Sequence, residues 1–532
     1  MANRYWVGTN GNWHSAANWS ATSGGAGGAG VPTDSDDVYI DGHGYVFIEA
    51  HAAIICNNFN LSASMTELLI LYEGGVIHGD YTQDAGYYAS IGEDIIEFKG
   101  NITLNAGTFT TGSVGGENPP HTLLSGNNKI VTNNSSGNVN CQWLTISGSI
   151  TTAGSRLQTI RVGGDLKDVS ALTIAAGNRL LIDDGATWTD LTGIIDGDGY
   201  ILFIPNTSAN IPITGTINCE FQIQYLHNWT LPARTWGGNF LIDVRANNLI
   251  FTMGEGKHYF NGQFQILADN ASITTRWTLD CAANNAEFRS LGKWYVNTNS
   301  FKQPSEFVLN LGGGIHIFYD EFQLGLFGTT TDMVLNPGDS TVILNPMKAI
   351  IYQYRMSRVV SGMPSTHQTL TWNKVYLLKT MSGLAVGIRF IEAFICKEGR
   401  FEFFDISTRG IRLRNYQLIP QHRHEFDKLV IVGYDYEKPI WGYFPNQLSF
   451  HTEVTINKDV ESFGITIQNV KTNVNDLVTY NSVLAGTQND GIILYNRDIK
   501  RIGQRNILNN SYKIISDPVP NLWIEKLIQK VA

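Results

Sequence analysis

The chain has 532 residues, of which 43% are hydrophobic and 16% are charged, and its formal net charge is −10. The charged share is far below the roughly 25% of an ordinary globular domain, and glycine, with 54 residues, exceeds its usual share of about 7%. This composition excludes a collagen, a coiled coil, a disulfide-rich scaffold and a globally disordered chain. No run of about 18 apolar residues occurs, so no membrane span is expected.

The five cysteines give no metal or disulfide signature. They are Cys56, Cys141, Cys219, Cys281 and Cys396. Their number is odd and no CxxC pair occurs, which argues against a disulfide framework and against a zinc knuckle. We therefore predict buried free thiols in a chain that folds in a reducing cytoplasm.

Residues 1–42 form the first predicted segment, a cap or anchor. Trp6, Trp13 and Trp19 fall within fourteen residues and can bury enough apolar area to cover a neighbouring surface. Residues 23–30 are glycine-rich and formally contain GxGxxG. No strand precedes that motif and no helix follows it, so a surface loop is expected rather than a dinucleotide site. An acidic cluster, Asp34, Asp36 and Asp37, then leads into a strand predicted at 38–40.

Residues 43–350 form the second segment, in which short apolar runs alternate with turn residues. Runs that start at 144, 172, 201, 221, 241 and 264 recur every 20 to 29 residues. A strand this short cannot bury its apolar face alone, whereas stacked coils form a continuous core, so the recurrence predicts a β-solenoid. Tandem β-sandwich domains are the alternative. In either case the fold class is all-β, because Gly, Asn, Thr and β-branched residues outweigh helix formers.

Residues 351–532 form the third segment, which is predicted to be a basic, β-rich domain. Its last twelve residues, 521–532, place Trp523, Leu527 and Val531 at helical spacing and predict a short amphipathic helix. A helix of this length is not stable alone, so it should dock, most simply on its own domain.

Charge is divided unevenly along the chain. Residues 1–150 hold 3 basic and 13 acidic side chains, whereas residues 351–532 hold 22 and 16. Such asymmetry predicts docking of the basic part on an acidic surface, for which Arg355, Arg358 and Lys374 are candidate contacts. The basic residues are too scattered for nucleic-acid binding.

The chain carries no strong catalytic motif: GxSxG, GxxxxGK[ST] and HExxH are all missing from the sequence. His422 and His424 would share one face of a strand, but no third ligand stands at a plausible spacing for a metal site. Several carboxylates cluster near aromatic side chains, as the carboxylates of a glycan-cleaving site would. They are Asp183, Asp184, Asp190, Asp196 and Asp198, near Trp188 and Tyr200, with a further pair at Asp320 and Glu321. Acidic turns in a β-protein explain these carboxylates more simply, so no catalytic, metal or cofactor site is predicted.

The N-terminal segment resembles a pattern found in structural proteins of tailed bacteriophages. The residues that carry it are Tyr5-Trp6-Val7-Gly8, Gly11-Asn12-Trp13, Ala17-Asn18-Trp19-Ser20, residues 23–30, Val31-Pro32-Thr33 and Asp36-Asp37-Val38. The match covers about forty of the 532 residues and includes no catalytic residue. A looser version of the pattern opens coils in bacterial surface adhesins, which need an export signal, and the N-terminus lacks the basic and apolar regions of a signal peptide.

This resemblance implies a non-enzymatic virion protein that assembles in the host cytoplasm. The expected role is an external appendage, either a tail fibre or spike or a capsid decoration protein, with host-surface attachment as a further role. The expected partners are other virion proteins and a host glycan. Further copies of the chain are also expected as partners, with a trimer favoured. The assembly candidates are Trp6, Trp13, Trp19, Arg355, Arg358, Lys374 and Trp523. A tailspike-type glycan depolymerase and a carbohydrate-binding adhesin are the competing functions.

Overall fold

The computed structural model describes most of the first 344 residues and separate segments beyond them. The described residues are 2–8, 10–41, 45–50, 52–72, 74–91, 94–112, 121–183, 186–206, 210–225, 227–246, 248–267, 276–297, 305–320, 322–324, 331–344, 351–353, 370–380, 389–390, 394–404, 412–413, 424–434, 447–463 and 466–472. They form two compact units. The first lies within Met1–Gly314 and Gly325–Gly338, and the second within Ile315–Leu324, Asp339–Arg355 and His367–Ala532.

The fold of the described residues is nearly all β, as predicted, and includes a solenoid of about 11 turns. Within the described part of the chain, the helical elements are two three-residue 3-10 turns, η1 (Ala16–Asn18) and η2 (Ala282–Asn284). The helix predicted at 521–532 lies outside the described residues.

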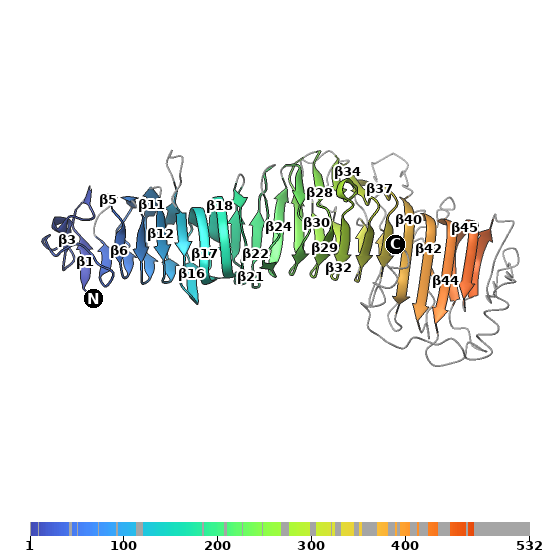
Figure 1. The fold of residues 1–532 in the computed structure, drawn as a ribbon, viewed down its shortest axis with the longest axis horizontal. Coiled ribbons are helices and arrows are strands. Elements are labelled where there is room, and N and C mark those ends of the chain that lie inside the picture. The colour runs from blue at the N-terminus through green and yellow to red at the C-terminus, as the bar shows by residue number, and fades with distance from the viewer. Residues whose placement is uncertain are drawn as a thin grey trace, which may run out of the picture. The chain divides into compact units, whose positions relative to one another are not determined.

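In the first unit most coils contribute strands to three faces, and strands of successive coils lie side by side along each face (Figure 1). Face A consists of β1 (Asn3–Trp6), β4 (Asp37–Ile40), β7 (Phe59–Leu61), β10 (Tyr81–Gln83), β13 (Ile102–Leu104), β16 (Lys129–Asn133), β21 (Ile194–Asp196), β23 (Thr216–Ile217), β26 (Thr235–Trp236), β29 (Lys257–Phe260) and β32 (Glu287–Ser290). Face B consists of β2 (Asn10–Asn12), β5 (Tyr45–Ala50), β8 (Glu67–Tyr72), β11 (Tyr87–Ile91), β14 (Thr108–Thr111), β19 (Arg179–Ile182), β22 (Tyr200–Phe203), β24 (Glu220–Tyr225), β27 (Phe240–Val244), β30 (Phe264–Leu267) and β33 (Trp294–Asn297).

Face C has two stretches, and two long strands take part in all three faces. The stretches are β6 (Ile54–Cys56), β9 (Gly75–Ile77), β12 (Ile95–Phe98), β15 (His121–Leu124) and β20 (Thr187–Trp188), then β25 (Trp229–Leu231), β28 (Ile250–Met253), β31 (Trp277–Asp280), β34 (Ser305–Asn310) and β37 (Thr331–Asn336). The long strands are β17 (Val139–Ala153) and β18 (Gln158–Thr173). Apart from one antiparallel pair, β1 with β3 (Trp19–Ser20), the described strand pairs are parallel. Sandwich domains are built from antiparallel sheets, so the alternative fold is wrong.

Alternation along each short strand fills the core of the solenoid. In β5, for example, Val46, Ile48 and Ala50 are buried while the residues between them face outward. Residues in register then stack coil on coil. Phe221, Phe240, Phe264 and Trp294 form one such column, with ring centroids 5.8, 5.7 and 5.5 Å apart and nearly parallel planes.

Asparagine and aspartate line a corner of the coils, where the chain turns and leaves backbone groups to be satisfied. Asp37 Oδ1 accepts hydrogen bonds from the side chains of Asn57 and Asn58, at 2.8 and 2.9 Å. Asn58 Oδ1 accepts from the Asp80 amide, and Asp80 Oδ1 accepts from the Asn101 amide, at 2.7 and 2.8 Å. Asn and Asp side chains at this corner thus join four successive coils.

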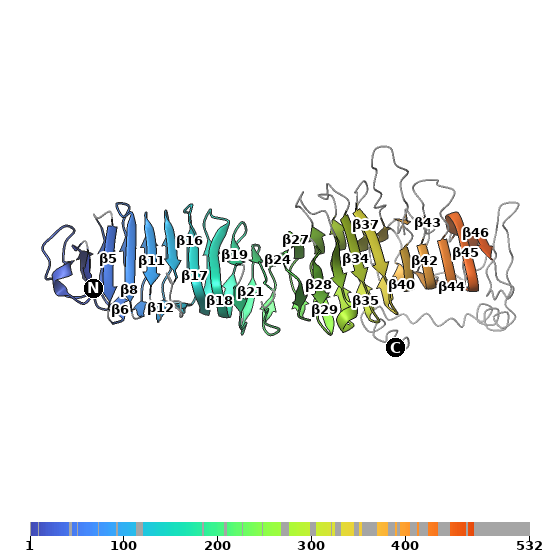
Figure 2. The ribbon, with the colours of Figure 1, turned by 90° about the horizontal axis from the view of Figure 1, so that it is seen from above.

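The strands of the second unit also pair in parallel (Figure 2). Four of them are long, with 11 to 17 residues. Its strands are β35 (Ile315–Phe318), β36 (Phe322–Leu324), β38 (Thr341–Leu344), β39 (Ile351–Gln353), β40 (Leu370–Thr380), β41 (Arg389–Phe390), β42 (Phe394–Phe404), β43 (Arg412–Leu413), β44 (His424–Tyr434), β45 (Gln447–Phe463) and β46 (Thr466–Thr472). β40, β42, β44 and β45 pair in that order.

Candidate assembly site at the N-terminal cap

The N-terminal segment is built into the end of the solenoid. β1 pairs in parallel with β4 on face A, and β2 pairs in parallel with β5 on face B. After β2 the chain turns through η1 and returns as β3, which pairs antiparallel with β1. Exposed edges of parallel sheets invite pairing with other chains, and this return covers the edge of face A.

The three tryptophans of the segment come together beneath this return and are all inaccessible to solvent. The Trp19 ring packs edge-on against the rings of Trp6 and Trp13, with centroids 5.0 and 4.8 Å apart. Trp13 also stacks on Phe59 of β7, with ring centroids 6.3 Å apart. The cluster therefore closes the apolar interior, and its rings lie inside the molecule rather than on a surface that a partner could contact.

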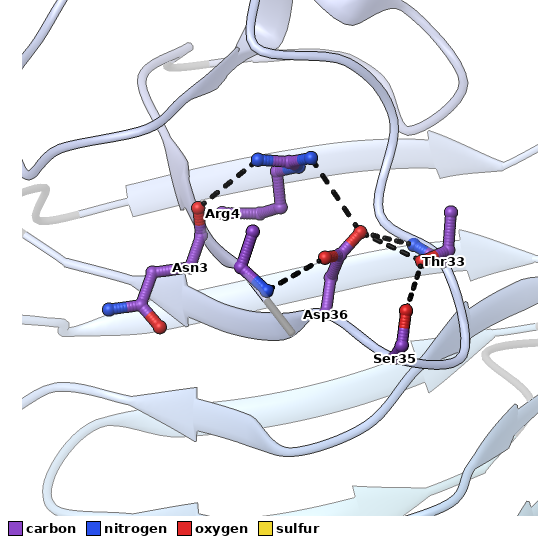
Figure 3. A network of polar contacts seen from close by, with 6 residues as sticks. Asn3, Arg4, Thr33, Ser35 and Asp36 are labelled. Atoms are coloured by element: carbon purple, nitrogen blue, oxygen red, sulfur yellow. Dashed lines mark hydrogen bonds and ion pairs between the residues drawn. The ribbon is translucent and has the colours of Figure 1, made fainter.

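Asp36 ties the start of the chain to the turn that precedes β4 (Figure 3). Its Oδ1 accepts a hydrogen bond from the Ala2 amide at 3.1 Å, and its Oδ2 accepts from the Thr33 amide and hydroxyl at 3.1 and 2.8 Å. Arg4 Nη2 lies 3.8 Å from Oδ2. Burial raises the pKa of Asp36, but these hydrogen bonds and the Arg4 charge outweigh it and hold the pKa below its usual value.

Sequence reasoning treated Asp36 as one member of an acidic cluster and missed this role. The signal was available, because a Thr three residues before an Asp is a spacing at which hydroxyl and carboxylate can close a turn. The neighbouring Asp34 is exposed, and Asp37 belongs to the corner ladder. The three carboxylates thus have separate surroundings.

Two of the carboxylates considered for glycan cleavage bond to side chains of the adjacent coil. Asp183 forms an ion pair with Arg161, and Asp196 Oδ1 accepts a hydrogen bond from the Thr173 hydroxyl at 2.8 Å. Trp188 is buried, and its Nε1 donates to the Asp190 carbonyl at 2.7 Å. A buried indole cannot stack on a sugar. Asp184 lies outside the described residues.

No group of three or more His, Cys, Asp or Glu side chains that could hold a metal is found among the residues that the structure describes. His424 starts β44, whereas His422 and Glu321 lie outside the description. The prediction of buried free thiols is confirmed for Cys56, Cys141, Cys219 and Cys281. Burial raises the pKa of Cys141 to about 11 and that of Cys219 to about 12, so both are inert thiols at neutral pH.

Of the predicted contacts in the basic segment, Lys374 is described. It lies in β40, partly exposed, and its amide donates to the Ser340 carbonyl at 3.3 Å. Arg355, Arg358 and Trp523 lie outside the described residues. In the part of the chain that the structure covers, no helix is long and apolar enough to cross a membrane.

Comparison with known proteins returned no matching family model, no matching curated protein and no matching solved structure.

Proposed function

We propose that the chain is a non-enzymatic structural component of a bacteriophage particle, located in an external appendage of the tail-fibre or spike type or in a capsid decoration. The observation that carries this proposal is the N-terminal pattern of Trp6, Trp13 and Trp19, which resembles that of phage structural proteins and forms the cap described above. A capped solenoid suits an appendage because it hides a sheet edge that would otherwise pair with neighbouring chains.

The bonding of Asp183 and Asp196 favours a structural role over a catalytic one for these two carboxylates. Asp183 and Asp196 contribute to contacts between coils through Arg161 and Thr173. A glycosidase needs one carboxyl group that can give a proton and a second that attacks or activates water, both facing the sugar. Carboxylates that already hold adjacent coils together are poorly placed for that chemistry.

The chain is proposed to work as a symmetric homo-oligomer, with a trimer favoured by the resemblance. Several large apolar side chains are exposed in the first unit, among them Ile213 at 69% and Leu291 at 50%, and a subunit interface would cover some of them. The basic segment, net +6, is proposed to dock on an acidic surface such as residues 1–150 of a neighbour. Light scattering should therefore report an oligomer at micromolar concentration that weakens from about 0.05 to 0.5 M salt. A monomer at both salt concentrations contradicts the oligomer.

The particle assignment is tested on particles purified by density gradient from lysates of the host that produces the chain. Antibodies raised against the purified chain should label an external structure by immunogold electron microscopy, and mass spectrometry should find its peptides in the particle band. Absence from that band contradicts the proposal. Release of oligosaccharides from host polysaccharide by the purified chain would favour the depolymerase instead.

A further inference from the structure

Two exposed tyrosines flank a glutamate on the outer surface of face B. Tyr45 of β5 and Tyr87 of β11 are both in register with Glu67 of β8, and Thr108 of β14 continues the line beyond Tyr87. Tyr45 is 49% exposed and Tyr87 is 40% exposed. We call Tyr45, Glu67, Tyr87 and Thr108 the tyrosine line.

The orientation of the line is fixed by the residues beside it. Val46, Leu68, Tyr88 and Phe109 follow its members in sequence and are all buried in the core. Successive residues of a strand point to opposite faces, so the four members of the line point outward. Neighbouring parallel strands lie about 4.8 Å apart, which places the two tyrosines about 10 Å apart along the stack of coils.

We propose that the tyrosine line binds an uncharged linear polysaccharide that runs along the stacked coils. The flat face of a tyrosine ring packs against the C–H face of a pyranose, and the phenol hydroxyl remains free to bond sugar or water. Glu67 accepts hydrogen bonds from sugar hydroxyls, and Thr108 can donate or accept. This inference rests on the proposed function, since it names what an external appendage would contact on a host surface.

The repeat of the line points to a polymer as its occupant. Its groups recur at the spacing of the coils, on a rigid sheet, so a ligand with a linear repeat can meet several of them at once. Tyrosine supplies contact area at low cost in side-chain entropy, because only two torsion angles are fixed on binding.

The charge on and around the tyrosine line favours an uncharged polysaccharide over an anionic one. The line holds one carboxylate and no cationic side chain, and residues 1–150 hold only 3 basic side chains against 13 acidic ones. An anionic polymer would be repelled by this field, whereas an uncharged one would not. Pairing of the line with the same line of a second copy would set two acidic surfaces against each other, which disfavours that contact.

The test uses affinity electrophoresis of the purified full-length chain in gels that contain dextran, mannan or galactomannan, with hyaluronate as the anionic comparison. The double variant Tyr45→Ser and Tyr87→Ser should weaken retention at least tenfold, and Glu67→Gln should weaken it severalfold. Tyr259→Ser is the matched control, because Tyr259 is 42% exposed on β29 of face A. The melting temperature of each variant is measured as well, and Tyr259→Ser should shift it about as much as either tyrosine substitution in the line, because the three side chains are exposed to a similar extent.

Three results would overturn the proposal: retention by none of the uncharged polysaccharides, an equal loss of retention in Tyr259→Ser, or a double variant whose sedimentation rather than retention changes. The last result would make the line an interface between copies. Particle incorporation separates this inference from the proposed function. The double variant should still join particles, and absence of the wild-type chain from particles refutes the proposed function whatever the gels show.

Discussion

The indole Nε1 of Trp19 donates a hydrogen bond to the main-chain oxygen of Trp13 at 2.7 Å, within a cluster of fully buried rings. The bond joins the chain that leaves β2 to the chain that returns as β3. The return is thereby fixed to the end of the solenoid by a polar bond as well as by packing.

Trp19→Ala should therefore destabilise the first unit by about 3–5 kcal/mol, because it leaves a cavity under the cap and removes this bond. Trp143→Ala is the control. Trp143 is partly exposed, with Lys167 Nζ 3.8 Å from its ring centroid, and its loss should cost about 1 kcal/mol. Thermal melting compares the two, and equal shifts would contradict the capping role.

Asp36→Asn should destabilise the cap by roughly 1.5–3 kcal/mol, because the hydrogen bonds from Ala2 and Thr33 lose a charged acceptor. The folded-state pKa of Asp36 is lowered, so its contribution is complete above the unfolded value of 3.8 and is lost as pH falls through the folded value. Asp34→Asn, in the same turn but exposed, should change neither melting temperature nor acid sensitivity. Melting curves of the wild type and both variants at pH 7 and pH 3 test these expectations. A variant as stable as wild type at pH 7 contradicts this account.

The buried imidazole of His258 should also make stability depend on pH, in a higher pH range than Asp36 does. It is buried in β29, its Nε2 lies 2.8 Å from the Gly254 carbonyl, and burial lowers its pKa to about 4 although that hydrogen bond raises it. The unfolded chain, with a pKa of 6.5, binds a proton first, so stability is complete above pH 6.5 and falls as pH drops toward 4.

The loss between pH 7 and pH 5 should be about 2 kcal/mol. His258→Gln should reduce this dependence, whereas the exposed-site variant His14→Gln should keep it. Melting temperatures measured at both pH values test the effect. An unchanged pH dependence in His258→Gln would show that another group is responsible.

Replacing Gly107 by alanine tests how tightly the corners of adjacent coils pack against each other. Its φ is +84°, and a Cβ there would overlap the main-chain oxygen of Gly86 in the adjacent coil. Gly177 has a similar φ of +78° but open space around the Cβ position, so Gly177→Ala carries the backbone strain without the overlap. Gly107→Ala should therefore lower the melting temperature clearly more than Gly177→Ala. Equal shifts would mean that the corners are not packed against each other.

The solenoid could be predicted from sequence because each coil has its own apolar run, but the coil length could not. The runs at 201, 221, 241 and 264 all lie on face B, where Ile201, Phe221, Phe240 and Phe264 are in register. The runs at 144 and 172 lie on other faces, so their intervals of 28 and 29 residues do not measure one coil. Leu144 is in register with Leu166, 22 residues on.

One feature of the candidate sites could be predicted from the sequence, whereas two others could not. Three tryptophans close together in sequence are sufficient to predict a buried layer, since few surfaces can leave so much apolar area exposed. The partners of Asp36 and the alignment of Tyr45 with Glu67 and Tyr87 depend on register between coils. Register is set by turn lengths that vary from coil to coil, so neither feature could be read from spacing alone.

The measurement that tests the central claim most directly is an electron cryomicroscopy map of the intact particle. The account predicts density outside the particle shell or along its tail with parallel strands about 4.8 Å apart, into which the coils and the Trp6–Trp13–Trp19 cap can be built. A complete map whose external densities are all accounted for by other chains would contradict it.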